Sequence, residues 1–168
     1  MVKKNFDKIC MIGMPGSGKS TIGRALSEHL KFSFYDTDEE IEFKKQSKIK
    51  DIFDNQGEDH FRKIERSIFK KLILNSNTVI SAGGGIILKN KDLLEQTFNI
   101  YLNCNIETLI ERTSRNNYRP LLKDNVEKNI KLLFNDRKEI YNKISDLTIN
   151  VTGNTQKTII SILDFLKQ

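Results

Sequence analysis

The glycine-rich segment Gly13–Thr21, GMPGSGKST, restricts the possible folds more than any other part of the chain. It follows the apolar run Ile9–Ile12 and precedes a stretch with helical spacing. The pattern GxxxxGKS in that context predicts a strand, a turn whose backbone N–H groups curl inward, and a helix that begins at the turn. A strand that feeds directly into a helix is typical of α/β proteins.

Strands and helices are predicted to alternate along the 168 residues. Short β-favouring runs lie at 8–12, 33–35, 78–81, 99–102 and 147–151. Helical patterns lie at 21–30, 39–45, 58–74, 92–96, 106–112, 126–144 and 156–166. Because βαβ crossovers place helices on both faces of a sheet, this order predicts a three-layer α/β/α fold with a five-stranded parallel sheet. Ligands are expected beyond the carboxyl ends of the strands.

The composition predicts a single domain over 1–168, since 38% of the residues are hydrophobic and no repeat or Pro/Gly/Ser linker divides the chain. Cys10 and Cys104 show no disulfide or zinc pattern, which indicates a reduced, cytoplasmic protein. No segment approaches the ~20 apolar residues that cross a bilayer, so we expect a soluble protein with no membrane partner. A monomer is the default expectation for the oligomeric state. The net charge of +6 does not distinguish nucleic acid, an acidic membrane surface or small anions as partners.

The glycine-rich segment also predicts nucleotide binding. Glycines allow the backbone to wrap phosphate groups at a helix N-terminus, Lys19 is expected to reach the β- and γ-phosphates, and the Ser20 hydroxyl is expected to ligate Mg²⁺. An ordinary strand-to-helix turn is the alternative, but it does not explain why Lys19 and Ser20 occupy these two positions. We therefore expect ATP or GTP with Mg²⁺ to be bound by Gly13, Met14, Pro15, Gly16, Ser17, Gly18, Lys19, Ser20 and Thr21.

Acidic residues follow the second predicted strand in the segment FYDTDEEIE. The third strand ends in Ser81, where many motor and switch ATPases have a magnesium-shell aspartate, so we expect Asp36 and Ser81 in the outer shell of the metal. Thr37 and Glu40 have the spacing of a capping box, which indicates a helix N-terminus. Asp36 and Asp38 are then either favourable helix-end charges, or one carboxylate faces Mg²⁺-bound water and the other a substrate hydroxyl; we expect both roles.

Basic residues and glycines suggest a second ligand beside the phosphates. Arg62 is either half of an exposed pair with Glu65 or a carboxylate-binding fork whose rotamer Glu65 fixes. The run Gly83–Gly85 is either a flexible turn or a surface that a ligand approaches closely. The polar segment 112–124 is either a solvated basic loop or a mobile lid that brings an arginine, such as Arg119, to the phosphates.

In combination, the segments GMPGSGKST, DTDEEIE, DIFDNQGEDHFRKIE, SAGGG, RPLL and NDRKEIY resemble the shikimate kinase family, within the nucleoside-monophosphate-kinase type of P-loop proteins. The resemblance spans nearly the whole chain. It implies transfer of the ATP γ-phosphate to the 3-hydroxyl of shikimate, on the route to chorismate and the aromatic amino acids. It also implies a substrate-binding region at about 36–64 and a lid at about 112–124.

The resemblance implies roles for individual residues. It assigns Lys19, Asp38 and Arg119 to catalysis, with Asp38 on the hydroxyls of the acid and Arg119 on the phosphates. It places Arg112, and by position Asn154, beside the nucleotide, and Ser20 and Asp36 at Mg²⁺. The residues that it assigns to shikimate are Asp38, Arg62, Gly83, Gly84, Gly85, Arg137, Phe53 and Phe61.

Two other functions fit parts of the sequence. A gluconate kinase shares the phosphate loop and an acidic pair after the second strand, but the segments SAGGG and HFRKIE argue against it. A nucleic-acid-associated ATPase fits the positive charge, but the basic residues are spread along the chain without aromatic residues between them. The shikimate kinase interpretation accounts for all the segments together, and it predicts small-molecule partners and no nucleic acid.

Overall fold

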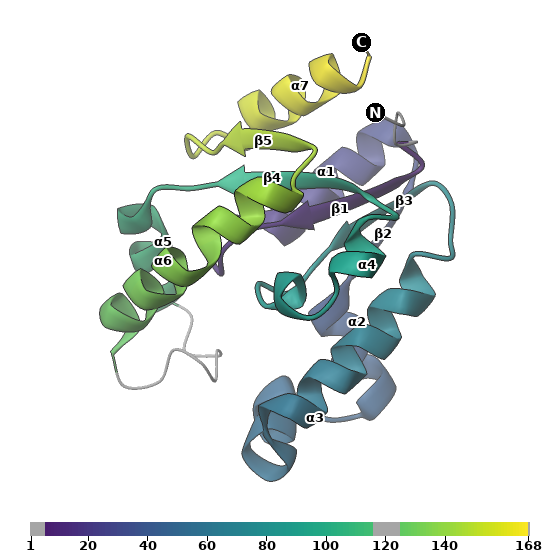
Figure 1. Cartoon of the computed structure of the whole chain (residues 1–168). Coiled ribbons are helices and arrows are strands. Elements are labelled where there is room, and N and C mark those ends of the chain that lie inside the picture. Colours follow the sequence, from purple (N-terminus) through teal and green to yellow (C-terminus); the bar gives the residue numbers. More distant parts are fainter. Residues whose placement is uncertain (1–5, 116–124, 168) are drawn as a thin grey trace.

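A central parallel sheet organises the computed structural model, which describes residues 6–115 and 125–167 (Figure 1). Its strands are β1 (Lys8–Ile12), β2 (Ser33–Asp36), β3 (Thr78–Ser81), β4 (Phe98–Asn103) and β5 (Leu147–Asn150). They lie in the order β2-β3-β1-β4-β5, and every neighbouring pair is parallel. The predicted five-stranded parallel sheet is confirmed, with strand ends within one residue of those expected.

Seven α-helices and one short 3₁₀ turn surround the sheet in the described part of the chain. They are α1 (Lys19–Leu30), α2 (Thr37–Lys45), α3 (Ile49–Leu72), η1 (Ile86–Leu88), α4 (Lys91–Leu94), α5 (Ile106–Ser114), α6 (Val126–Ile144) and α7 (Thr155–Leu166). The prediction was wrong about the start of α3, which begins well before 58. Gly57 interrupts the helix with φ 77° and ψ 171°. Because the spacing of apolar residues changes phase at this kink, the sequence predicts only the second half of α3 as helical.

Alternating side chains of β1 divide the core into two layers. Ile9 and Met11 face the side covered by α1 and α7, whereas Cys10 and Ile12 face the side covered by α3, α4, α5 and α6. All four side chains are fully buried, as expected for the middle strand of a sheet covered on both faces. Each large aliphatic side chain buried in this way contributes about 1.5–3 kcal/mol.

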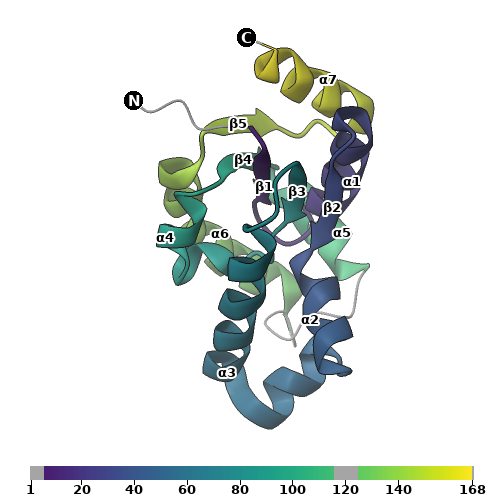
Figure 2. The ribbon, with the colours of Figure 1, turned by 90° about the vertical axis from the view of Figure 1, so that its right-hand side faces the viewer.

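Helix α2 packs against α3, and together they project from the sheet as an arm (Figure 2). The arm begins directly at the carboxyl end of β2 and returns to the sheet through the second half of α3. Side chains on its inner surface can therefore face the loops that follow β1 and β3. None of the helices within 6–115 and 125–167 combines the length and the apolar character needed to cross a bilayer.

Candidate active site

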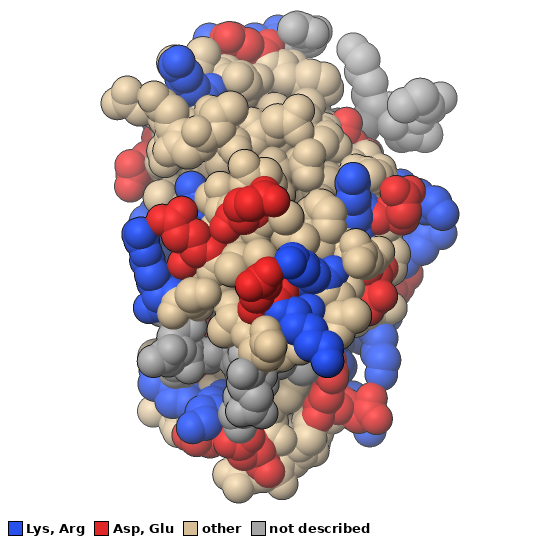
Figure 3. Space-filling view, turned by 90° about the vertical axis from the view of Figure 1, so that its left-hand side faces the viewer, with Lys and Arg blue, Asp and Glu red and all other residues tan. Residues whose placement is uncertain are grey.

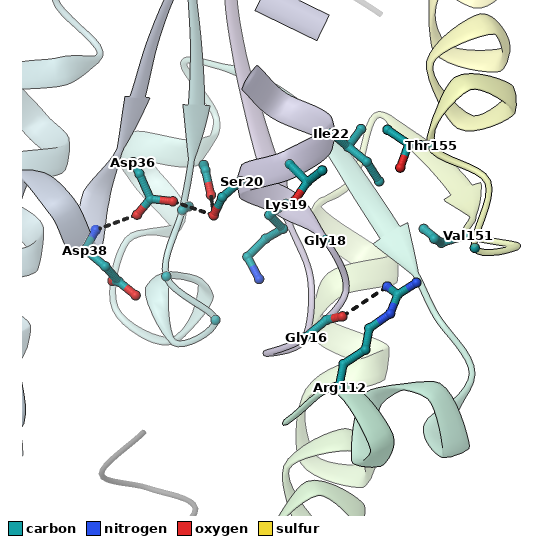
Figure 4. A pocket seen from close by; sticks show the side chains of 16 residues that line it. Gly16, Gly18, Lys19, Ser20, Ile22, Asp36, Asp38, Arg112, Val151 and Thr155 are labelled. Carbon is teal, nitrogen blue, oxygen red and sulfur yellow. Dashed lines mark hydrogen bonds between the residues drawn. The ribbon is translucent and has the colours of Figure 1, made fainter. Parts of the chain in front are cut away.

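A cavity of about 340 Å³ opens at the carboxyl ends of the strands (Figure 4). Four segments contribute to it: the glycine-rich loop and start of α1, the end of β2, the loop after β3, and the region of α5 and α7. The residues that line it are Gly16, Gly18, Lys19, Ser20, Thr21, Ile22, Asp36, Asp38, Ser81, Ala82, Gly83, Gly84, Arg112, Val151, Gly153 and Thr155. The cavity thus lies where the fold predicts a ligand.

The loop before α1 has the backbone of a phosphate cradle. Gly16 and Gly18 have φ 83° and 92°, a left-handed conformation that side chains with a Cβ rarely adopt. A Cβ on Gly16 would also lie 2.9 Å from the Thr113 hydroxyl of α5. Lys19 is buried, and its Nζ donates to the carbonyl oxygens of Gly13 (3.1 Å) and Met14 (3.0 Å). The ammonium group thus lies against the glycine-rich loop at the N-terminus of α1, where helices favour anions.

Three oxygen atoms meet at the start of α1. The Ser20 hydroxyl donates to Asp36 Oδ2 at 2.6 Å and lies 3.2 Å from the Ser81 hydroxyl. Hydroxyl and carboxylate oxygens suit Mg²⁺, which binds one or two protein groups together with substrate phosphates and water. Within the described ranges, no group of three or more His, Cys, Asp or Glu side chains could hold a metal by itself. The donor set therefore fits a Mg²⁺ that is bound largely through nucleotide phosphates.

The start of α2 differs from the predicted capping box. The N-cap is Asp36, whose Oδ1 accepts the Asp38 N–H at 3.0 Å, so Thr37 is already the first helical residue. The prediction that Thr37 is the N-cap was therefore wrong. Its buried hydroxyl instead accepts the Gly83 N–H at 2.9 Å, a contact between segments far apart in the sequence. One carboxylate oxygen of Asp36 accepts the N–H that caps α2, and the other accepts the Ser20 hydroxyl. Asp36 can therefore act both at the helix end and at the expected metal site.

Arg62 is buried, which bears on the first of its two expected arrangements, the exposed pair with Glu65. Its Nη1 donates to Glu65 at 2.8 Å, and its Nε and Nη2 donate to Glu58 Oε1 at 3.1 and 2.9 Å. Glu65 is buried as well, whereas the Glu58 side chain is 46% exposed. The exposed pair is thus excluded. Glu65 holds one edge of the Arg62 guanidinium. The other edge faces the carboxylate of Glu58, which is exposed to solvent.

The glycine run after β3 brings two arginines together. The Arg62 guanidinium lies so close over Gly85 that a Cβ there would overlap it. Arg137 of α6 is also buried and donates its Nη1 to the Gly84 carbonyl at 3.0 Å. A larger residue at Gly85 would therefore displace Arg62. Arg137 could not be distinguished from a solvated helix residue by its spacing alone.

Glu65 and Asp38 both lie close to Gly83. A Cβ on Gly83 would lie 2.9 Å from Glu65 Oε1 and 3.0 Å from Asp38 Oδ1. Burial, together with the Asp38 charge, raises the pKa of Glu65 to about 7, although Arg62 and Arg137 oppose the shift. Glu65 Oε1 has no hydrogen-bond partner among the residues that the structure describes. The Asp38 side chain points into the cavity on the same side as the Lys19 ammonium group (Figure 4).

The remaining predicted residues lie around this centre. Phe53 and Phe61 pack against each other with ring centroids 4.6 Å apart, and Phe61 is buried next to Arg62 in the chain. Arg112 lines the cavity and donates to the Gly16 carbonyl at 3.3 Å. The Asn154 side chain caps α7 by accepting the Lys157 N–H, while its neighbours line the cavity.

Arg119 and most of the lid predicted at 112–124 lie outside the described residues. The sequence analysis did not predict Tyr141 of α6, whose hydroxyl reaches both the phosphate loop and the glycine run. The available signal was its position four residues after Arg137, on the same face of a helix.

The chain resembles known proteins over nearly its whole length. Residues 15–167 match the family model described as shikimate kinase. A shikimate kinase of Clostridium botulinum (strain ATCC 19397 / Type A) is 42% identical over 168 residues, which cover 97% of this chain and 98% of that protein. The structure of a shikimate kinase from Acinetobacter baumannii in complex with shikimate has a TM-score of 0.93 and 32% identity, covering 98% of this chain and 94% of that one.

A more distant likeness concerns the fold alone. The structure of a gluconokinase from Sinorhizobium meliloti 1021 has a TM-score of 0.61 at 17% identity and covers 97% of this chain and 93% of that one. The fold is therefore shared by kinases with different acceptors, and the acceptor must be argued from the side chains of the site.

Proposed function

The chain belongs to the shikimate kinase family, and we propose that its cavity transfers the γ-phosphate of ATP to the 3-hydroxyl of shikimate. The observation that supports this acceptor most strongly is the convergence of Arg62 and Arg137 on the glycine run beside Asp38. A small acid with several hydroxyl groups needs cations for its carboxylate and a hydrogen-bond acceptor for its hydroxyls. Both kinds of group lie near the phosphate loop, which supports the proposal.

The carboxylate of shikimate is assigned to the outer edge of Arg62 and to Arg137. Glu65 holds the inner edge of Arg62, so Nε and Nη2 keep their direction and can bind a carboxylate in a bidentate manner. These two donors now bind Glu58, whose exposed side chain can give way to the substrate. Phe53 and Phe61 are proposed as the apolar wall of the same pocket, and Gly83–Gly85 as the surface on which the ring lies.

The triphosphate of ATP is assigned to the loop Gly13–Thr21. Lys19 lies within this loop and can turn from the Gly13 and Met14 carbonyls to the phosphates. Mg²⁺ would be held by Ser20 directly and by Asp36 through water, and when bound it neutralises charge on the phosphate oxygens. Arg112 and, by position, Asn154 are proposed to lie near the base, and Arg119 to approach the phosphates.

For the transfer step, Asp38 is assigned to the acceptor hydroxyl. Its carboxylate points into the cavity beside Lys19, so it can orient the hydroxyl and accept its proton as the oxygen attacks phosphorus. Positioning of the two reactants and neutralisation of the phosphoryl oxygens by Lys19 provide the larger part of the acceleration.

The proposal is tested by comparing two arginines that lie one helical turn apart in α3. Arg62→Ala removes the carboxylate fork and should raise the KM for shikimate at least about tenfold, while the KM for ATP changes little. Arg66→Ala is the matched control, because Arg66 binds the exposed Asp92 at 2.7 Å. An Arg62→Ala variant with unchanged shikimate kinetics would contradict the proposed site.

The acceptor itself is tested with the unmodified protein in a coupled ADP assay with gluconate, nucleoside monophosphates and shikimate. Preference for shikimate is expected, and preference for another acceptor would overturn the assignment. Binding to nucleic acid is not expected: the face in Figure 3 carries acidic and basic side chains side by side rather than a basic strip. We further propose a cytoplasmic monomer that acts as a single domain.

A further inference from the structure

The hydroxyl of Tyr141 lies between the two halves of the active site. It is 2.6 Å from the Gly84 carbonyl oxygen in the glycine run and 3.0 Å from the Gly13 carbonyl oxygen in the phosphate loop. Tyr141 is fully buried in α6, and its ring stacks on Tyr101 of β4 with centroids 5.0 Å apart and planes inclined by 13°. The packed ring gives the hydroxyl little freedom to move.

The two loops that Tyr141 contacts also touch each other. A Cβ on Gly84 would lie 3.1 Å from the Pro15 ring and 3.5 Å from the Gly13 carbonyl oxygen. The carbonyl oxygens of Gly13 and Gly84 lie 3.0 and 2.6 Å from the same hydroxyl oxygen of Tyr141, and their partial negative charges repel. A hydroxyl proton between them offsets this repulsion, and burial, the largest influence on the group, raises the pKa of Tyr141 so that the proton is kept.

Each carbonyl also accepts a bond from a charged group of the site. Lys19 donates to the Gly13 oxygen, and Arg137 donates to the Gly84 oxygen. These two cations are the groups assigned to the phosphates and to the carboxylate of the acid. Among the described side chains, Tyr141 lies within hydrogen-bond distance of the carbonyl oxygens of both Gly13 and Gly84. It has no assigned contact with ATP or with shikimate.

We propose that Tyr141 is a positioning residue whose hydroxyl fixes the spacing between the phosphate loop and the glycine run, and thereby the alignment of the acceptor hydroxyl with the γ-phosphate. The inference rests on the proposed function, because the glycine run is the surface assigned to shikimate. Alignment matters most in the transfer step, since small displacements of well-placed reactants slow a reaction strongly while each reactant still binds.

The test is Tyr141→Phe, which keeps the stacked ring and removes the hydroxyl. We expect kcat for phosphoryl transfer to fall about ten- to a hundredfold, while the KM values for ATP and shikimate change by less than about threefold. ATP hydrolysis without an acceptor should change little, so the ratio of transfer to hydrolysis should fall. A merely structural role would lower the melting temperature without changing this ratio.

Tyr101→Phe is the matched control. It removes the other hydroxyl of the same aromatic stack, which lies 3.3 Å from the Asn103 side chain and contacts neither loop in the described structure. Its kcat should equal that of the unmodified protein. Gly84→Ala provides a second approach, because its methyl group presses on Pro15 and changes the same spacing with Tyr141 intact; it too should lower kcat.

The outcomes separate the inference from the function on which it rests. If the unmodified protein does not phosphorylate shikimate, the proposed function fails. If it does, and Tyr141→Phe keeps kcat within about twofold, the positioning role is overturned. Should Tyr141→Phe fail to fold, Gly84→Ala decides: unchanged kcat in that variant overturns the inference, and a selective loss of kcat supports it.

Discussion

Glu58 binds the edge of Arg62 that faces away from Glu65: its Oε1 accepts from both Nε and Nη2, at 3.1 and 2.9 Å. A substrate carboxylate assigned to this edge must compete with Glu58 for the same two donors. The Glu58 side chain is 46% exposed, so solvent screens this pair more than the buried pair of Arg62 with Glu65. The structure therefore describes an arginine that is held firmly on one edge and weakly on the other.

Glu58→Gln should lower the KM for shikimate about two- to fivefold, because a neutral amide competes less well with the substrate carboxylate. Initial rates at saturating ATP measure this change. Asp59→Asn is the control, since Asp59 is the adjacent carboxylate and pairs with the exposed Lys89 at 2.8 Å. A higher KM in Glu58→Gln would instead mean that Glu58 helps to hold Arg62 for the substrate.

Asp36→Asn tests the metal site separately from the helix cap. Asparagine caps helices as well as aspartate does, so the melting temperature should hardly change. The amide lacks the charge that attracts the metal and its water shell, so the Mg²⁺ concentration for half-maximal activity should rise about tenfold. Rates measured against free Mg²⁺ at saturating ATP and shikimate give this value. An unchanged Mg²⁺ curve would remove Asp36 from the metal shell.

The sheet and the phosphate loop were predictable because their causes are local. Each strand is a short run of β-favouring residues, and GxxxxGKS encodes a turn and a helix start within nine residues. The first half of α3 was not predicted, because the kink at Gly57 breaks the phase of the apolar spacing along the helix. The cap was assigned to Thr37 because a spacing rule cannot show which of two adjacent cap-forming residues turns its side chain back.

The less predictable parts of the site depend on distant contacts. Tyr141 meets Gly13 across 128 positions of the chain and Gly84 across 57. No periodicity in α6 reports such a meeting, since inward-facing residues of a helix have the same spacing whether they fill the core or reach a ligand. Arg62 is a similar case. The neighbouring sequence allowed either an exposed or a buried Arg62–Glu65 pair, and only the packing of Arg62 against the distant Gly85 shows that the pair is buried.

Glu65 should make stability depend on pH. Its pKa is raised from the ordinary 4.5 to about 7, mainly by burial and despite Arg62, with Asp38 and Arg137 as the other charged groups near it. The folded protein therefore keeps a proton that the unfolded chain loses. This stabilisation is complete below about pH 4.5 and is lost as the pH rises through about 7, at up to about 1.4 kcal/mol per pH unit.

Urea denaturation at several pH values between 5 and 8 measures this effect. In the Glu65→Gln variant this side chain is neutral at every pH. The free energy of unfolding of the variant should therefore lack the decrease with rising pH that is attributed to Glu65. The difference between the two proteins isolates this group from others that titrate in the same range. Parallel curves for the unmodified protein and the variant would show that Glu65 is ionised across the whole range.

Asp38→Asn tests the group assigned to the acceptor hydroxyl. The amide has nearly the same shape and still accepts a hydrogen bond, but it cannot take a proton, so kcat should fall at least about a hundredfold. The KM for ATP should stay within about twofold, because the phosphate loop is unchanged. Glu39→Gln is the control, since Glu39 is the next carboxylate in α2 and pairs with the exposed Arg24 at 3.5 Å. Near-native kcat in Asp38→Asn would show that the carboxylate only orients the hydroxyl and that the proton leaves by another route.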